Sequence, residues 1–285
     1  MIVITGATGA LGGATVDHLL QHVEPGALAV VARDPARAAR FTDRGVEVRR
    51  GDYARPESLR AAFAGAEQLV LVSSNDPTGD PVAQHRGAIE AAAQAGVGRV
   101  LYTSHQGASA ASPFPAARTH AATEELLAGS GLPWTSLRNG FYAHSLAFLL
   151  GPWRQTGRIR IPGDGPVSWT AREDEAEGAA AVLLSAGAYD GPATLTAAAA
   201  PTFAQVAEIA GEVAGKPVAV ELVDPEQWVA EAVAAGLPEG RARFTLGIFQ
   251  AAEQGYFAGT DPLLGRLLGR EPRSVRDALH AATGS

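Results

Sequence analysis

Short apolar runs and amphipathic segments alternate along the first half of the chain. The apolar runs are too short for helices and are bounded by Gly, Pro or polar residues, so we interpret them as buried parallel strands. The segments between them carry apolar residues at helical spacing and are predicted helices. Strands are expected at 2–4, 27–32, 46–48, 68–72, 99–102 and 132–137, and helices at 10–23, 56–63, 82–95 and 116–128. This alternation predicts an α/β fold with a doubly wound parallel sheet.

The alternation of strands and helices changes beyond Tyr142. Short strands are expected at 158–161, 193–196 and 218–222, helices at 174–186, 203–213 and 225–235, and further helices and turns from 239 on. Thr202 and Asp224 are good N-cap residues for two of these helices. We therefore predict that residues 1–145 form the main domain. Residues 146–285 are expected to form a smaller C-terminal α+β lobe that covers a substrate and partly completes the sheet.

Three glycines follow the first predicted strand with the spacing G-x-x-G-x-x-G and lead into the first helix. Residues without a Cβ let the backbone approach a ligand closely, and a helix N-terminus attracts anions. The turn is therefore predicted to hold the pyrophosphate of a dinucleotide, and the alternative is an ordinary glycine-rich turn. The residues assigned to this part of the site are Gly6, Thr8, Gly9, Ala10, Leu11 and Gly12.

The second predicted strand ends at Arg33, and Arg37 lies one turn into the next helix. In dinucleotide-binding folds an acidic residue at this place binds the ribose 2′-hydroxyl, whereas an arginine accommodates a 2′-phosphate. Asp34 is adjacent, but Asp34-Pro35 is typical of an N-cap and a first helical residue. We therefore predict NADP(H) as the cofactor. NAD(H) is the alternative if Arg33 is only a solvated loop residue.

Polar residues also stand at the ends of the next three strands. Asp52 is predicted to meet the adenine amino group, with Tyr53 beside it. Parallel strands bind ligands at their carboxyl ends, so the polar residues after the fourth and fifth strands are expected to form a wall of the cofactor site. These residues are Ser73, Ser74, Asn75 and Thr103. The alternative is turn chemistry alone, because 76–80 also has the composition of a loop.

Composition narrows the classes of partner. The 285 residues include no cysteine, which excludes disulfides and thiolate metal sites. The net charge is −7 with no clustered basic face, which argues against nucleic acid. No apolar run is long enough for a membrane span, and a strand starting at Ile2 leaves no room for a signal peptide. We expect a cytoplasmic protein with a small-molecule partner and no metal, and make no prediction of its oligomeric state.

Several motifs resemble those of one known family. The glycine turn is similar to that of extended and atypical short-chain dehydrogenases/reductases. Further stretches resemble the NmrA-like branch, and within it the type 2 NADPH:quinone oxidoreductases. They are Ala32-Arg33-Asp34-Pro35, Gly51-Asp52-Tyr53, Gln84-His85-Arg86, Ala95-Gly96-Val97, Tyr102-Thr103-Ser104, His120 with Glu124, and Leu137-Arg138-Asn139-Gly140. The resemblance implies a Rossmann-type NADP-binding domain at 1–145.

The residues predicted to face the acceptor come from the fifth and sixth strand ends and the helix between them. Where many short-chain dehydrogenases carry Tyr-x-x-x-Lys, this helix offers His120 and Glu124, so alcohol chemistry with that dyad is not expected. Ser104 and Asn139 are predicted to bond an acceptor oxygen, and His120 to donate a proton, with His105 and His144 as alternative donors near the same mouth. Tyr142, after Phe141, could form an aromatic wall. The alternatives are a helix-surface role for His120, a turn for Asn139 and packing at a domain junction for Tyr142.

The resemblance implies two activities, and we favour the first. It is hydride transfer from NADPH to a quinone or a related conjugated aromatic ketone, a small planar acceptor whose electrophilic ring needs little acid catalysis. The second is a sensor of NADP(H) without turnover that acts on a protein partner. A third variant is tailoring of quinones or hydroquinones, including net oxygenation, in the biosynthesis of aromatic natural products.

Overall fold

The computed structural model describes residues 1–76, 79–185 and 187–281, and the chain forms two compact units. Unit 1 comprises Met1–Ser104, Thr119–Arg138 and Glu173–Ala193, and unit 2 comprises His105–Arg118, Asn139–Arg172 and Thr194–Ser285. The chain thus passes between the units several times, and a single boundary at residue 145 stays a prediction. No helix within the described ranges is long and apolar enough to cross a membrane.

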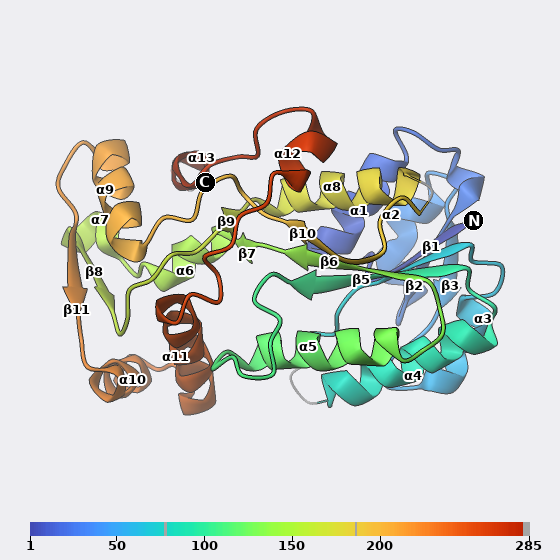
Figure 1. Ribbon diagram of the computed structural model, residues 1–285, viewed down its shortest axis with the longest axis horizontal. Coiled ribbons are helices and arrows are strands. Elements are labelled where there is room, and N and C mark those ends of the chain that lie inside the picture. Colours follow the sequence, from blue (N-terminus) through green and yellow to red (C-terminus); the bar gives the residue numbers. More distant parts are fainter. Residues whose placement is uncertain (77–78, 186, 282–285) are drawn as a thin grey trace. The chain divides into compact units, whose positions relative to one another are not determined.

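The central sheet has seven strands in the order β10-β6-β5-β4-β1-β2-β3 (Figure 1). β1 pairs in parallel with β2 and β4, so that Ile2 lies opposite both Leu28 and Gln68. The strand order reverses between β1 and β4, and ligands of such sheets bind in the crevice outside this point. The strands are β1 (Ile2–Thr5), β2 (Leu28–Ala32), β3 (Glu47–Arg50), β4 (Gln68–Leu71), β5 (Arg99–His105), β6 (Trp134–Asn139) and β10 (Gly191–Leu195). The predicted doubly wound α/β fold is confirmed.

Helices cover both faces of the sheet in unit 1. Figure 1 shows α3, α4 and α5 along one side and α1, α2 and α8 along the other. Leu59, Ile89 and Leu127 come from the first group and share one buried cluster with Val3 and Val100 of the strands. The helical elements are α1 (Ala10–Leu19), η1 (Pro25–Ala27), η2 (Pro35–Ala38), α2 (Ala39–Thr42), η3 (Pro56–Ser58), α3 (Leu59–Ala62), α4 (Pro81–Gln94), α5 (Pro115–Ala128) and α8 (Arg172–Leu184).

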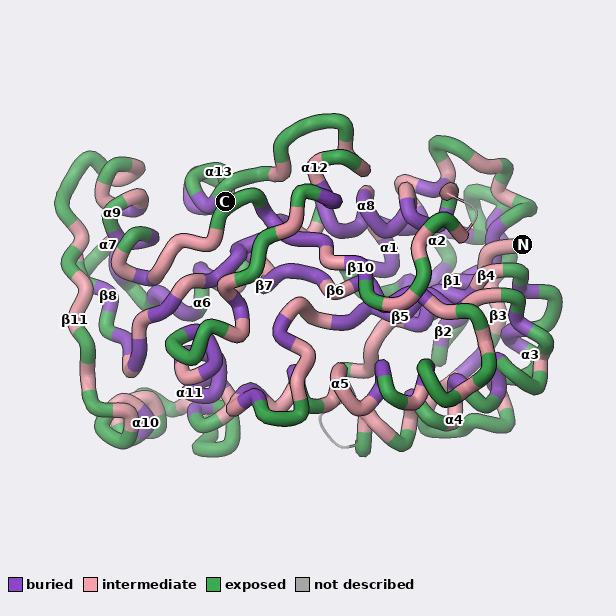
Figure 2. The backbone as a smooth tube through the Cα atoms, in the orientation of Figure 1, coloured by how far each residue is buried: buried purple, intermediate pink, exposed green. Residues whose placement is uncertain are grey.

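Unit 2 contains two small parallel sheets, β7 with β9 and β8 with β11. Trp169, Phe203, Phe249 and Phe257 are fully buried in its core. In β7 Phe141 is buried and Tyr142 half-buried, whereas β11 is intermediate or exposed along its length (Figure 2). The elements are β7 (Phe141–Tyr142), η4 (Ala143–Ser145), α6 (Leu146–Leu149), α7 (Trp153–Thr156), β8 (Arg158–Ile161), β9 (Trp169–Thr170), α9 (Phe203–Ala214), β11 (Ala219–Leu222), α10 (Pro225–Ala234), α11 (Glu239–Glu253), α12 (Leu263–Leu268) and α13 (Val275–Ala281).

The predicted N-caps form as local chemistry requires. Asp34 accepts one backbone N–H of the turn that follows, Asp224 accepts two, and Thr202 forms a reciprocal capping box with Gln205. The first helix is shorter than predicted. It ends at Leu19 rather than near residue 23, because the next residues close 3₁₀-type turns instead of continuing the α-helical bonds.

Candidate functional site

The turn between β1 and α1 depends on the absence of side chains at its glycines. Gly6 has φ +62°, in the left-handed region that favours glycine. A Cβ at Gly12 would lie 2.6 Å from the carbonyl oxygen of Gly6, closer than real Cβ contacts. Gly9 is the N-cap of α1 and makes no side-chain hydrogen bond, so the first N–H groups of the helix are available to a ligand.

A cavity of about 310 Å³ opens beside this turn, and only residues of unit 1 line it. Ten of the predicted cofactor-binding residues line it: Gly6, Thr8, Gly9, Arg33, Arg37, Asp52, Tyr53, Ser73, Ser74 and Asn75. Ala10, Leu11, Gly12 and Thr103 do not. Thr103 instead supports the wall, because its hydroxyl oxygen accepts the backbone N–H of Ser73 at 2.8 Å. The structure therefore brings most of these residues together.

Two arginines stand at one side of the cavity. Arg33 and Arg37 are both exposed, and both line the cavity. Within the described residues neither guanidinium forms a salt bridge with a carboxylate. Two such cations can bind a phosphate through charge-assisted hydrogen bonds in a planar fork geometry.

Tyr53 and Asp52 line the cavity in different ways. The Tyr53 hydroxyl can donate to Oγ1 of Thr5 at 2.6 Å or to the carbonyl of Val72 at 2.8 Å. Burial raises the pKa of Tyr53, so this hydroxyl stays protonated. Asp52 forms a salt bridge of 3.5 Å with Arg55, whose side chain is 55% exposed. Tyr53 is thus a fixed part of the wall, whereas the Asp52 carboxylate keeps acceptor capacity for a ligand.

Helix α4 contributes two residues that sequence reasoning did not assign to the site. Gln84 lines the cavity and accepts a hydrogen bond of 2.5 Å from the Ser74 hydroxyl. Nε2 of His85 accepts the backbone N–H of Ser74 at 2.8 Å, so the neutral ring carries its proton on Nδ1, which lies 2.8 Å from Oγ1 of Thr123. His85 is fully buried, and this burial lowers its pKa to about 4. Together these two side chains fix the end of β4 against α4.

Residues 6–186 match the family described as NAD(P)H-binding. This chain belongs to the NAD(P)H-binding family. Within the family it is 33% identical over 280 residues to quinone oxidoreductase 2 of Escherichia coli (strain K12), with 98% of this chain and 97% of that protein covered. It is 31% identical over 285 residues to the NmrA-like family domain-containing oxidoreductase flvB of Aspergillus flavus, with 97% and 92% covered.

A solved structure of the same family supports the fold over the whole chain. The NADPH-dependent quinone oxidoreductase QOR2 from Escherichia coli, complexed with NADPH, matches with a TM-score of 0.92 and 31% identity. The match covers 99% of this chain and 100% of the other. The predicted Rossmann-type fold and the resemblance to NmrA-like oxidoreductases are confirmed.

Ser104 is held in a buried polar cluster of unit 1. Its hydroxyl donates to Oε1 of Glu124 at 2.7 Å, and the same oxygen accepts Ser136 Oγ at 2.6 Å and Arg138 Nε at 3.0 Å. Burial alone would raise the pKa of Glu124, but the hydrogen bonds from Arg138, Ser136 and Ser104 outweigh it and hold the pKa below its usual value. In the structure the Ser104 proton is thus directed at Glu124, and the bond from Ser104 to an acceptor oxygen stays a prediction.

We expect Glu124→Gln to lower the free energy of unfolding by about 2 kcal/mol. The change leaves Arg138, whose side chain is 31% exposed, without its carboxylate partner. Urea denaturation monitored by circular dichroism measures the effect. Glu125→Gln, on the exposed neighbour in the same helix, is the matched control and should change stability by less than about 0.5 kcal/mol. Equal effects of the two variants would contradict a stabilising role for this cluster.

The predicted proton donor His120 pairs with a buried tyrosine. Nδ1 of His120 lies 2.8 Å from the hydroxyl of Tyr102, and the two rings are 5.7 Å apart. Burial raises the pKa of Tyr102, so its hydroxyl stays protonated and can donate a hydrogen bond to Nδ1 of His120. In that arrangement the neutral imidazole of His120 carries its own proton on Nε2.

The remaining predicted acceptor residues lie in unit 2. Asn139 is 3% exposed, and its Oδ1 has no hydrogen-bond partner among the described residues. Its backbone carbonyl accepts the N–H of Gln106 at 2.8 Å. Tyr142 stacks on His144 at 5.3 Å, and the Arg172 guanidinium lies 5.1 Å from the Tyr142 ring. A buried amide oxygen without a partner is costly, so Asn139 is suited to accept a hydrogen bond from a ligand.

Proposed function

We propose that this protein is an NADPH-dependent oxidoreductase that transfers a hydride to quinones or related conjugated aromatic ketones. The observation that carries the proposal is a cavity with the glycine turn at one side and, at another, two arginines that form no salt bridge with any residue the structure describes. It occurs in a chain that matches quinone oxidoreductase 2 over 98% of its length. Turnover is favoured over sensing or tailoring, because these full-length relatives are named as oxidoreductases.

In this proposal the cofactor fits the residues present. The N–H groups of Ala10, Leu11 and Gly12 hold the pyrophosphate, since α1 begins with no side-chain cap. Arg33 and Arg37 hold the 2′-phosphate. The adenine meets Asp52 beside Tyr53, and the wall from Ser73 to Asn75 with Thr103 confines the rest. Bound NADPH supplies the hydride for the reaction.

The chain's own groups then orient the acceptor. In this proposal His120 donates a hydrogen bond from Nε2–H to the acceptor oxygen, because its Nδ1 is bonded to Tyr102, and the hydroquinone anion takes its proton from water. Asn139 orients the acceptor by donating from its amide nitrogen to the carbonyl oxygen of the quinone, and Tyr142 offers a flat surface for a planar ring. A quinone needs little more, because its two-electron reduction gives a delocalised, weakly basic anion. That residues 146–285 form a substrate-covering lobe, and that the protein acts in the cytoplasm, are part of this proposal.

Replacing Arg33 by alanine tests the cofactor assignment and turnover together. We expect kcat/KM for NADPH in quinone-dependent oxidation to fall about 10- to 100-fold, because a charge-assisted hydrogen bond to the 2′-phosphate is lost. The same constant for NADH, which lacks that phosphate, should change less than about 2-fold. Arg60→Gln, on an exposed arginine of α3 away from the cavity, is the control. An unchanged NADPH/NADH ratio would remove Arg33 from the site.

A further inference from the structure

A chain of hydrogen bonds leads from the wall of the dinucleotide cavity to helix α5. The backbone N–H of Ser74, which lines the cavity, donates to Nε2 of His85 at 2.8 Å. Nδ1 of His85 lies 2.8 Å from Oγ1 of Thr123, and this hydroxyl donates to the carbonyl of Thr119 at 2.9 Å. All four residues belong to unit 1. The chain therefore joins the segment after β4 to the turn of α5 that carries His120.

The direction of each hydrogen bond in this chain follows from its two ends. A backbone amide can only donate, so Nε2 of His85 is an acceptor and the neutral ring carries its proton on Nδ1. A backbone carbonyl can only accept, so the Thr123 hydroxyl donates to it and accepts from His85. Neither main-chain end takes up or releases a proton near neutral pH. The chain is therefore unsuited to a proton relay and suited to holding its members in place.

Tyr102 gives His85 a second connection to His120. The rings of His85 and Tyr102 meet edge-on with centroids 5.4 Å apart, and the Tyr102 hydroxyl lies 2.8 Å from Nδ1 of His120. His85, Tyr102 and Thr123 are all fully buried. Closely packed interiors transmit strain from one side chain to the next. A shift of His85 is therefore expected to reach His120 both along α5 and through the ring of Tyr102.

We propose that His85 and Thr123 are positioning residues for His120. They hold the turn of α5 on which His120 lies, and with it the Nε2–H that donates to the acceptor oxygen. Both side chains are fully buried and neither lines the dinucleotide cavity, so they act through the helix. A donor that is already in place stabilises the developing oxyanion without first reorganising. This role in the reaction rests on the proposed function, whereas the positioning of His120 does not.

Replacing Thr123 by valine removes the hydroxyl at a similar side-chain volume. We expect kcat for quinone reduction at saturating NADPH to fall about 10-fold, because a small misplacement of a group near the reacting atoms is costly. The dissociation constant for NADPH should change less than about 2-fold, since His85 still accepts the N–H of Ser74. Thr123→Ser, which retains the hydroxyl, should restore kcat.

Thr245→Val is the matched control for this substitution. Thr245 is also a buried helical threonine, and its hydroxyl donates to the carbonyl four residues earlier at 2.9 Å. It belongs to unit 2 and has no part in the chain from Ser74 to Thr119. Its replacement should therefore leave kcat unchanged.

A second pair of variants tests the positioning without turnover. In cofactor-free protein labelled with nitrogen-15, the ring nitrogen signals of His120 report its tautomer and hydrogen bonds, and a His120→Gln variant assigns them. His85→Leu breaks the chain, so we expect it to shift these signals although the hydrogen bonds of His85 go to Ser74 and Thr123. His85→Gln can still accept from Ser74 and donate to Thr123, so its His120 signals should match those of wild type.

The outcomes separate the positioning from the reductase function. The proposal is wrong if Thr123→Val lowers kcat no more than Thr245→Val, or if Thr123→Ser is as impaired as Thr123→Val. It is also wrong if the His120 signals are the same in His85→Leu and wild type, and this comparison decides the matter if Thr123→Val does not fold. If the wild type reduces no quinone while the His120 signals respond as expected, the reductase function fails and the positioning stands.

Discussion

Replacing Gly12 by alanine is expected to raise the dissociation constant for NADPH at least about 100-fold. The new Cβ would lie 2.6 Å from the carbonyl oxygen and 2.8 Å from the carbonyl carbon of Gly6. Both atoms belong to the backbone, so no side chain can move to relieve the overlap. The turn must open, and the N–H groups at the start of α1 then no longer converge on the pyrophosphate.

Calorimetric titration with NADPH measures the affinity, and thermal unfolding of the same samples measures the fold. Gly26→Ala is the matched control, because a methyl group at that position would have no heavy atom within 4 Å and the change should leave binding unaltered. Gly9→Ala, whose Cβ would meet the Gly6 oxygen at 3.2 Å, should give an intermediate loss even if Gly12→Ala unfolds. Wild-type affinity in a folded Gly12→Ala protein would contradict the proposed role of the turn.

Acidification is expected to destabilise the fold through His85. Its pKa is lowered to about 4 by burial, against an ordinary value of 6.5, with the carboxylate of Asp80 acting in the opposite direction. Between pH 6.5 and about pH 4, His85 is protonated in the unfolded chain but neutral in the folded protein. The free energy of unfolding is therefore highest above pH 6.5 and decreases as the pH falls toward 4. The slope is about 1.4 kcal/mol for each pH unit and the full loss about 3 kcal/mol. His105, whose pKa burial also lowers to about 4, contributes in the same direction.

Urea denaturation at a series of pH values between about 4 and 7 measures this dependence. His85→Gln is the informative variant, since its side-chain oxygen can accept the Ser74 N–H but does not titrate. The His85→Gln variant should be less stable than wild type near neutral pH, and its free energy of unfolding should decrease less on acidification. Its NADPH affinity near neutral pH should stay closer to wild type than that of His85→Leu, which has no acceptor for Ser74. The same acid slope in His85→Gln and wild type would contradict the assignment.

Local chemistry explains which parts of the site could be predicted from the sequence. The glycine turn, Arg33 and the Asp34 cap are each specified within a few residues, because backbone conformation, strand ends and capping are local properties. Their positions in the fold follow once the order of strands and helices is known. This is why most of the predicted cofactor-binding residues line one cavity.

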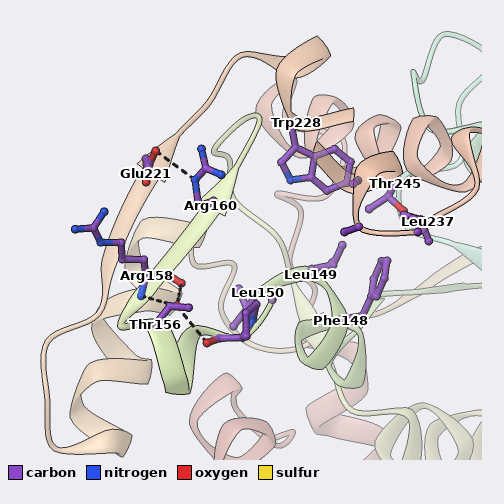
Figure 3. A pocket seen from close by; sticks show the side chains of 15 residues that line it. Phe148, Leu149, Leu150, Thr156, Arg158, Arg160, Glu221, Trp228, Leu237 and Thr245 are labelled. Atoms are coloured by element: carbon purple, nitrogen blue, oxygen red, sulfur yellow. Dashed lines mark hydrogen bonds and ion pairs between the residues drawn. The ribbon is translucent and has the colours of Figure 1, made fainter. Parts of the chain in front are cut away.

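The parts that could not be predicted depend on contacts between distant segments. Ser104 has the local signature of a ligand donor, but Glu124, 20 residues away, accepts its proton. His85 acts on Ser74 only because α4 packs against the end of β4, and nothing in its local sequence fixes its acceptor nitrogen. A second cavity, of about 850 Å³ in unit 2, joins segments from Phe148 to Thr245 and has no motif at all (Figure 3).

The central claim, hydride transfer from NADPH to a quinone, is tested most directly by an anaerobic assay with purified protein and a panel of benzo-, naphtho- and anthraquinones. Both NADPH oxidation and hydroquinone formation are measured, so that reoxidation by oxygen cannot hide or inflate the stoichiometry. The account predicts many turnovers, one hydroquinone for each NADPH consumed, and a strong preference for NADPH over NADH. Tight NADPH binding without oxidation above the uncatalysed rate for any quinone would contradict it.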